Sequence, residues 1–312
     1  MTGPSHQVLI VGLGAISGAH LHALEQIPGA EVVAGVDSAS RSAEFRGHPV
    51  PVYSHAGQAA GHHNPDVVVV ATPASTHAAV CDQVAGAFPA ARILVEKPAA
   101  DTLEGARHII TGLGARQPVD VAYHMSFSPE VDWGLTITQA NARELGRPAR
   151  IWARFVDPYS DQPDAAARYG TSWIDSGINA LSIVNRFTRL SDRTSLRQLE
   201  PEPLSTFEAR ISCGTPDHRF EALILTTWHV TDPAKTTTIS YKSGASLIMD
   251  HVAVAAYLIR DDQISGHFGT DRSVPRQHRH YSALYQSWLV NGTPIASPAT
   301  HMQLHDLLLK PG

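Results

Sequence analysis

Asp175 and Asn179 stand four residues apart in the stretch "WIDSGINALSIVNRF", residues 173–187. The apolar residues of this stretch recur at helical spacing, which predicts an amphipathic helix over 175–187. The carboxylate and the amide then lie one helical step apart on the same side. A carboxylate can accept a proton from a hydroxyl, whereas an amide can only orient that hydroxyl through hydrogen bonds. The pair is a candidate site for chemistry on a hydroxyl. The alternative is that Asp175 only caps the helix.

A second group of candidate residues lies in "GLGAIS", residues 12–17, between a predicted strand and a predicted helix. Gly12 and Gly14 permit a tight turn and a close approach of the backbone to a diphosphate, and Ser17 takes the third position of the G-x-G-x-x-G pattern. The amides of Ala15 and Ile16 at the start of the helix can bind the phosphates. The motif alone is weak, but strand, turn and helix in this order favour a dinucleotide site.

Asp37 ends the next predicted strand, in position to bind a ribose 2′-hydroxyl. Its charge repels a 2′-phosphate and so favours NAD, whereas Ser38 and Arg41 nearby can accommodate that phosphate. The sequence therefore predicts NAD as the preferred cofactor, with use of NADP left open.

Composition limits the classes of partner. The chain has 312 residues, with 24 Lys and Arg against 29 Asp and Glu, which is not the basic balance of a nucleic-acid or membrane-surface protein. Its 2 cysteines make no disulfide framework, and its 18 histidines are scattered without the spacing of metal ligands. Neither a secretion signal nor a membrane-length apolar run is evident. We expect a cytoplasmic protein with no metal, whose partners are small molecules and other copies of itself.

The length predicts more than one domain, and the order of elements predicts an α/β fold. Strands alternate with helices through the first part of the chain, which is typical of a doubly wound parallel sheet. The expected strands of this Rossmann domain are "QVLIV" (7–11), "EVVAGVD" (31–37), "DVVVVATP" (66–73), "ARILVEKP" (91–98) and "PVDVAYHM" (118–125). Residues 1–122 are the expected dinucleotide-binding domain.

The pattern changes near residue 145. Runs such as "FEALILTTWHV" and "KTTTISYK" follow one another with short turns, which predicts an open, mostly antiparallel sheet in an α+β domain. We expect this substrate-binding and oligomerisation domain over residues 123–293. Residues 294–312 are expected to form a C-terminal helix that returns to the first domain.

Two further motifs follow the third and fourth strands: "ATPASTH" at 71–77 and "EKP" at 96–98. With them, nearly the whole chain resembles the glucose–fructose oxidoreductase, inositol dehydrogenase and rhizopine-catabolism (Gfo/Idh/MocA) family. The resemblance implies a dinucleotide-binding domain joined to a domain with an open sheet. It also implies that the lysine of the "EKP" motif, Lys97, reaches the nicotinamide and the substrate. The other residues that it places along the cofactor are Thr72, Pro73, His77, Glu96 and Pro98.

Within that family, "GINALSIV" after Asp175 resembles the branch of aldose 1-dehydrogenases that act on D-galactose and L-arabinose. In this branch the Asp and the Asn line the sugar site. "AYHMSFSP" at 122–129 is similar to the branch segment "WHSRFAP" and places His124 near the substrate. One departure concerns the sugar pocket: the branch has Phe-Asp-Pro-Gly where this chain has Ile174-Asp175-Ser176-Gly177. The departure bears on the substrate more than on the reaction type.

Oxidation of a sugar at C1 transfers a hydride to nicotinamide and releases the hydroxyl proton. Asn179 cannot take that proton, which leaves Lys97, Asp175 and His124 as candidate acceptors. Each also has a purely structural interpretation, as a surface lysine, a helix cap and a buried histidine. Trp173 is a candidate for contact with the sugar, with packing as its alternative.

The sequence thus predicts an NAD(P)-dependent aldose 1-dehydrogenase that makes a lactone. Two other functions stay open: a reductase of a keto-sugar or cyclic imine, and a non-catalytic, nucleotide-bound sugar sensor. The open sheet leaves an apolar face, so we expect a homo-oligomer, either a dimer or a tetramer.

Overall fold

The computed structural model describes residues 6–39, 50–162, 164–165, 169–190, 194–202, 206–215 and 218–310. The chain divides into two compact units. Unit 1 comprises Met1–Tyr123 with Gln277–Met302, and unit 2 comprises His124–Arg276 with Gln303–Gly312. The boundaries expected from the sequence, at 122/123 and 293/294, stay a prediction.

Unit 1 contains a parallel sheet of 6 strands in the order β3-β2-β1-β4-β5-β6, which confirms the predicted doubly wound fold. The four valines of β4 are fully buried, because strands at the centre of a parallel sheet are covered on both faces. The sequence analysis missed the short edge strand β3. The strands are β1 (His6–Val11), β2 (Ala30–Val36), β3 (Val52–Tyr53), β4 (Val67–Val70), β5 (Arg92–Glu96) and β6 (Val119–Ala122).

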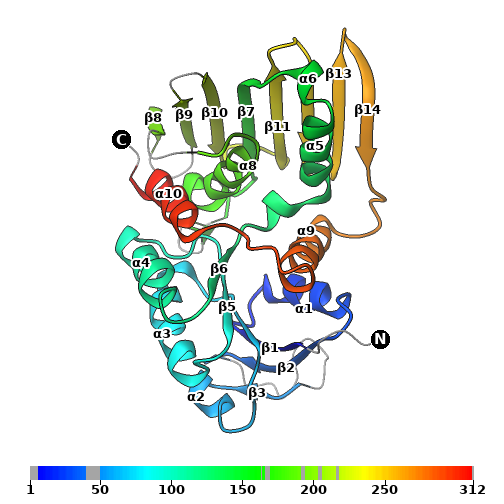
Figure 1. Cartoon of the computed structure of the whole chain (residues 1–312). Coiled ribbons are helices and arrows are strands. Elements are labelled where there is room, and N and C mark those ends of the chain that lie inside the picture. The colour runs from blue at the N-terminus through cyan, green and yellow to red at the C-terminus, as the bar shows by residue number, and fades with distance from the viewer. Residues whose placement is uncertain are drawn as a thin grey trace. The chain divides into compact units, whose positions relative to one another are not determined.

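Helices cover this sheet, and Figure 1 shows α2, α3 and α4 side by side. A segment distant in sequence also joins unit 1: α9 packs on α1, where the rings of His22 and His278 stack 3.9 Å apart. The helical elements are α1 (Ser17–Glu25), α2 (Ala56–Ala59), η1 (Ala74–Thr76), α3 (His77–Ala87), α4 (Leu103–Arg107), η2 (His108–Leu113), α9 (Arg276–Tyr285) and η5 (Gln286–Val290).

Unit 2 is built on a sheet of 8 strands in the order β14-β13-β12-β11-β7-β10-β9-β8. All its pairings are antiparallel except that of β7 with β10, so the predicted mostly antiparallel sheet is confirmed. The strands are β7 (Pro148–Val156), β8 (Ser195–Glu202), β9 (Thr206–Thr215), β10 (His218–Thr227), β11 (Ala234–Tyr241), β12 (Ser246–Asp250), β13 (Ala255–Arg260) and β14 (Gln263–Gly269).

The helices of unit 2 cover one face of that sheet, with α8 against β7 and α5 against β12, β13 and β14 (Figure 1). The alternating burial of β11 and β12 agrees with this one-sided cover. No helix among the described residues is long and apolar enough to cross a bilayer. The helical elements are η3 (His124–Phe127), α5 (Pro129–Ala140), α6 (Ala142–Leu145), η4 (Trp173–Gly177), α8 (Ile178–Thr188) and α10 (Pro298–Leu309), which spans the boundary of the two units in sequence.

The turn after β1 depends on one glycine. Gly12 has a φ of +90°, and a Cβ added to it lies 2.7 Å from the carbonyl carbon of Ala71 and 2.8 Å from Cγ2 of Thr72. Gly14 has no atom within 4 Å of its added Cβ among the described residues. The first glycine is therefore required by the protein itself, whereas the second leaves open space.

We expect Gly12→Ala to lower the free energy of unfolding by about 1–3 kcal/mol, because an alanine is strained at positive φ and clashes with the neighbouring loop. Gly14→Ala is the matched control and should unfold within about 0.5 kcal/mol of the wild type in urea titrations. Equal stability of the two variants contradicts this account of the turn.

Candidate active site

The glycine turn of unit 1 is fastened from two sides. The Asp37 carboxylate accepts the backbone N–H of Leu13 at 2.8 Å through Oδ2 and that of Ala39 at 2.8 Å through Oδ1. The buried hydroxyl of Ser17 donates to the carbonyl of Gly14 at 2.6 Å. A carboxylate oxygen accepts more than one hydrogen bond, so Asp37 keeps acceptor capacity for a ribose hydroxyl. The serine in the third position of the motif secures the turn as well as allowing close packing.

His77 joins two loops that the sequence analysis placed along the cofactor. Its Nε2 lies 2.7 Å from the carbonyl oxygen of Thr72, and its Nδ1 lies 3.2 Å from those of Pro98 and Ala99. Burial lowers the pKa of His77, although hydrogen bonds to these carbonyls oppose the shift. A neutral ring donates only one proton, so it serves one loop at a time. With an exposed fraction of 1%, His77 connects the loops from the inside.

Glu96 is the last residue of β5, and Lys97 is the first residue after it. The Glu96 side chain is buried, and its Oε2 accepts the backbone N–H of Lys97 at 3.1 Å. The loops after β1, β2, β4 and β5 leave neighbouring strands of one parallel sheet. Ligands of such sheets bind outside the carboxyl ends of the strands.

Most predicted cofactor residues are therefore gathered at one edge of unit 1. Ile16 precedes α1, Ser38 is exposed after β2, and Pro73 precedes η1. Arg41 lies outside the described residues. The residues at this edge are Gly12, Gly14, Ala15, Ile16, Asp37, Ser38, Thr72, Pro73, Glu96, Lys97 and Pro98, with His77 beneath them.

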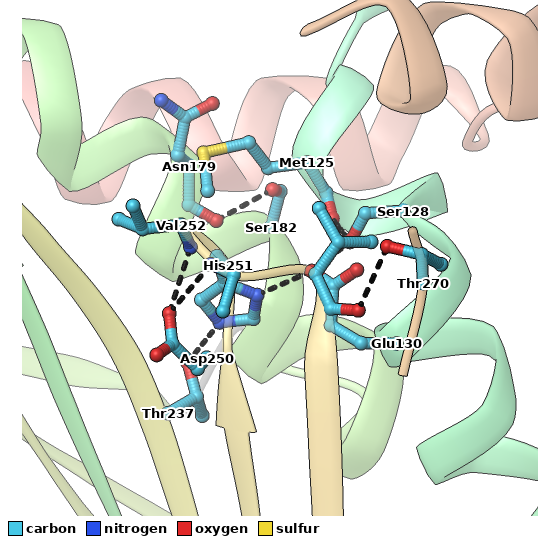
Figure 2. Close-up of polar contacts among 12 residues, drawn as sticks. Met125, Ser128, Glu130, Asn179, Ser182, Thr237, Asp250, His251, Val252 and Thr270 are labelled. Atoms are coloured by element: carbon cyan, nitrogen blue, oxygen red, sulfur yellow. Dashed lines mark hydrogen bonds and ion pairs between the residues drawn. The ribbon is translucent and has the colours of Figure 1, made fainter. Parts of the chain in front are cut away.

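In unit 2, the turn η3 that begins with His124 rests on a buried polar network. Glu130 lies at the start of α5 and accepts hydrogen bonds from Ser128 and from Nδ1 of His251, which is 2.7 Å away. Nε2 of His251 lies 2.9 Å from the Thr237 hydroxyl. Figure 2 shows this chain of contacts running from the sheet to the turn. Because these side chains are completely or almost completely buried, they hold η3 on the sheet.

Asn179 has an exposed fraction of 3% and keeps unused hydrogen-bonding capacity. Its Nδ2 makes a long contact of 3.5 Å with the backbone carbonyl of Asp175, and its Oδ1 has no partner among the described residues. In Figure 2 the carboxamide extends past Met125, away from the His251 network. A buried amide oxygen without a partner lowers the stability of the fold by about 1–3 kcal/mol. Its presence here favours a ligand that donates a hydrogen bond to it.

Asp175 lies in the π-helical turn η4, before α8. The predicted helix over 175–187 is present, but it begins before Asp175, because η4 runs directly into α8 at Ile178. At its start the Thr171 hydroxyl oxygen accepts the backbone N–H of Ile174 at 3.2 Å. The interpretation of Asp175 as the helix cap is therefore wrong. π-Helical turns are rare in proteins, and those that do occur often lie at functional sites.

A buried ion pair fastens the turn that carries Asp175. Nζ of Lys235 lies 2.8 Å from Oδ2 of Asp157, and the Ser176 hydroxyl donates to the same oxygen at 3.0 Å. The exposed fractions of these residues are 7% or less. Ser176 is one of the residues that depart from the Phe-Asp-Pro-Gly pattern described above. Its hydroxyl ties the turn to Asp157.

Aromatic side chains adjoin this ion pair. Tyr159 stacks on Tyr169 with ring centroids 5.2 Å apart and meets Trp228 edge-on at 6.1 Å. Burial raises the pKa of Tyr159, and the charges of Asp157 and Asp175 raise it further. Tyr159 therefore stays protonated and can donate, but it cannot act as a base near neutral pH.

Trp173 packs inside unit 2. Its exposed fraction is 3%, and its indole N–H donates to the carbonyl of Leu308 at 2.9 Å. A Cβ added to Gly177 would lie 2.5 Å from the Trp173 ring. These contacts favour the packing interpretation over contact with a sugar.

The first comparison with known proteins concerns unit 1. A family model described as "Oxidoreductase family, NAD-binding Rossmann fold" (Gfo/Idh/MocA) matches residues 6–120. This range contains both the glycine turn and the "EKP" motif. Residues 6–120 of the chain therefore match the NAD-binding domain of this family, which agrees with the predicted cofactor.

One curated relative is a D-apiose dehydrogenase from Paraburkholderia graminis, which is 32% identical to this chain over 204 residues. The match covers 60% of this chain and 52% of the relative, so the chain spans about half the length of the curated relative that it matches.

Solved structures share the fold. A dehydrogenase from Chromobacterium violaceum has a TM-score of 0.78 at 17% identity, with 99% of this chain and 94% of that chain covered. GenD2 from gentamicin A biosynthesis, in complex with NAD, has a TM-score of 0.78 at 18% identity, with coverage of 100% and 94%. At these identities the likeness shows the fold alone.

The sequence analysis missed the buried ion pair of Lys235 and Asp157 beside Asp175. Lys235 carried a detectable signal, because it lies in the inward-facing phase of β11 together with Thr237, Ile239 and Tyr241. A lysine in that phase needs a buried counter-ion. Asp157 carried no comparable signal, since it lies in a loop.

We expect Lys235→Met to lower the free energy of unfolding by about 3–5 kcal/mol, because it leaves the Asp157 carboxylate buried without its cation. Lys242→Met, at an exposed lysine of the same unit, is the matched control and should change stability by less than about 0.5 kcal/mol. The double variant Asp157→Asn/Lys235→Met should recover part of the loss in urea unfolding. Equal unfolding of Lys235→Met and Lys242→Met would show that the pair contributes nothing.

Proposed function

We propose that this protein is an NAD-dependent dehydrogenase that oxidises an aldose at C1 to a lactone. The observation that carries the proposal is the unpartnered, buried carboxamide oxygen of Asn179, one helical step from Asp175, in a chain whose other unit binds NAD. A sugar hydroxyl supplies the donor that this oxygen lacks. The curated relative is named for D-apiose, which is itself an aldose.

The proposed roles divide between the two units. Unit 1 binds NAD at the strand edge and presents Lys97, whereas unit 2 binds the sugar through Asp175, Asn179 and His124. When bound, NAD accepts the hydride from C1. Asn179 orients the reacting hydroxyl, and Lys97, Asp175 or His124 accepts its proton. We expect the protein to work in the cytoplasm, where NAD is available.

We also propose that two copies associate through the uncovered face of the unit 2 sheet. The register places one row of side chains across five neighbouring strands of that face. Trp152 and Tyr257 in this row are exposed by 36% and 37%. In a two-fold dimer the same patch of both subunits forms the interface, so this row can pack against its own copy. The row consists of Leu223, Trp152, Thr238, Ile248 and Tyr257.

Lys97→Met and Asp175→Asn should each lower kcat by at least about 100-fold if the side chain takes part in proton transfer. The measurement is NADH formation from NAD with D-apiose, D-galactose and L-arabinose. Lys242→Met and Asp262→Asn, at exposed positions, are the matched controls and should keep wild-type turnover.

Three outcomes contradict parts of this proposal. Near-wild-type turnover in either variant removes that residue from the chemistry. NADH consumption with a keto-sugar or a cyclic imine, without oxidation of aldoses, assigns a reductase. NAD and sugar binding without turnover assigns a sensor.

Trp152→Glu should convert the oligomer to monomers, because the substitution buries a charge within the proposed interface. Sedimentation equilibrium measures the mass directly and distinguishes a dimer from a tetramer. Arg143→Glu, on the exposed helix α6, is the control and should leave the mass unchanged. A wild-type monomer, or an oligomer that Trp152→Glu does not affect, contradicts the proposed interface.

A further inference from the structure

Glu96 is the centre of a buried network that reaches across unit 1. Nε2 of His20, on α1, donates to its Oε1 at 3.0 Å, and the hydroxyl of Tyr281, on α9, donates to the same oxygen at 2.6 Å. Behind His20, the Tyr285 hydroxyl lies 2.8 Å from Nδ1 of the imidazole. His20, Tyr281 and Tyr285 are fully buried, and Glu96 has an exposed fraction of 6%. Two elements distant in sequence, α1 and α9, thus converge on the residue before Lys97.

The network keeps Glu96 ionised. Burial alone raises the pKa of this carboxyl, but the hydrogen bond and charge of His20, the hydrogen bond of Tyr281 and the charge of Lys97 outweigh it, so the pKa is lowered. Burial raises the pKa values of Tyr281 and Tyr285 well above their usual value, and the Glu96 charge raises them further. Both phenols are therefore protonated, and Tyr281 donates a hydrogen bond to Glu96.

The ionised carboxylate acts on Lys97 in two ways. Its charge attracts the ammonium, and its second oxygen holds the backbone N–H of Lys97 at 3.1 Å. Burial lowers the pKa of His77, on α3, and the Glu96 charge opposes this shift without reversing it. The position of Lys97 thus depends on a charge that His20 and Tyr281 maintain.

We propose that His20 and Tyr281 are positioning residues, which hold Glu96 as a carboxylate and through it fix the place and charge of Lys97. The proposal rests on the proposed function only in assigning Lys97 to the reaction. Its physical content is independent of that assignment. When Glu96 is protonated, Lys97 loses its counter-charge, and the hydrogen bond that anchors its backbone N–H is weakened.

The chain offers a direct probe, because it contains only four lysines: Lys97, Lys235, Lys242 and Lys310. Reductive ¹³C-methylation of the full-length protein gives each lysine its own NMR resonance, and Lys97→Arg identifies that of Lys97. The pH dependence of this resonance reports the ionisation of Lys97 at the basic end and that of Glu96 at the acid end.

Tyr281→Phe removes one hydrogen-bond donor from the Glu96 carboxylate. The effect of burial on its pKa is then opposed less, so the carboxyl is protonated at higher pH. We expect the acid midpoint of the Lys97 resonance to rise by about one pKa unit, and the acid limb of kcat/KM to move with it. Tyr123→Phe is the matched control, because this buried phenol of unit 1 has its hydroxyl 3.2 Å from Nδ1 of another residue, His301. It should leave both midpoints at their wild-type values.

Glu96→Gln provides a second, independent readout. Loss of the carboxylate should lower the basic midpoint of Lys97 by about one unit and abolish the acid transition that Tyr281→Phe displaces. His20→Asn should resemble Tyr281→Phe in the acid range. If Tyr281→Phe does not fold, the basic midpoint in Glu96→Gln decides the question.

Midpoints that are the same in the wild type, Tyr281→Phe and Glu96→Gln overturn the proposal. Failure of the proposed function is a separate result: turnover that survives in Lys97→Met removes Lys97 from the reaction, whereas the NMR titration still shows whether the network controls its charge. A loss of stability alone, with unchanged midpoints, assigns His20 and Tyr281 a purely structural role.

Discussion

Buried carboxylates need donors and cations around them, and each unit has such a carboxylate beside a candidate reactive group. In unit 1 it holds the backbone N–H of Lys97, and in unit 2 it holds the residue after Asp175. Glu96 precedes Lys97 and is surrounded by His20 and Tyr281. Asp157 is paired with Lys235 and holds Ser176, which follows Asp175. An unpaired charge in these positions would cost several kcal/mol. The geometry of each reactive group therefore depends on a neighbour that never needs to meet substrate.

The local signals in the sequence were sufficient for the elements that carry the site. Glycines after an apolar strand and Asp37 at the end of the next strand follow from short-range rules of chain geometry. The "EKP" motif was found through its resemblance to a known family. Together these signals predicted the parallel sheet correctly and gathered the cofactor residues at its carboxyl edge. The helix that carries Asn179 was also predicted correctly, because its apolar spacing is regular.

Long-range pairings could not be predicted in the same way. Tyr281 is 185 positions from Glu96, and Lys235 is 59 positions from Ser176, so no local pattern connects them. The π-helical turn at Asp175 was missed because it precedes the regular apolar spacing, which begins at Ile178. The parallel pairing of β7 with β10 was likewise outside the reach of strand patterns.

The surroundings of the candidate acceptors narrow the choice among them. In unit 2, Lys235 is committed to Asp157, Tyr159 stays protonated, and Asn179 has no proton to exchange, so Asp175 and His124 remain. In unit 1, the Glu96 charge favours the ammonium form of Lys97, whereas the positive nicotinamide ring of bound NAD opposes it. An ammonium has no lone pair with which to accept a proton, but it stabilises a developing alkoxide. Under the proposed function, these charges favour Lys97 as the group that lowers the energy of the alkoxide, which leaves Asp175 and His124 as the proposed proton acceptors.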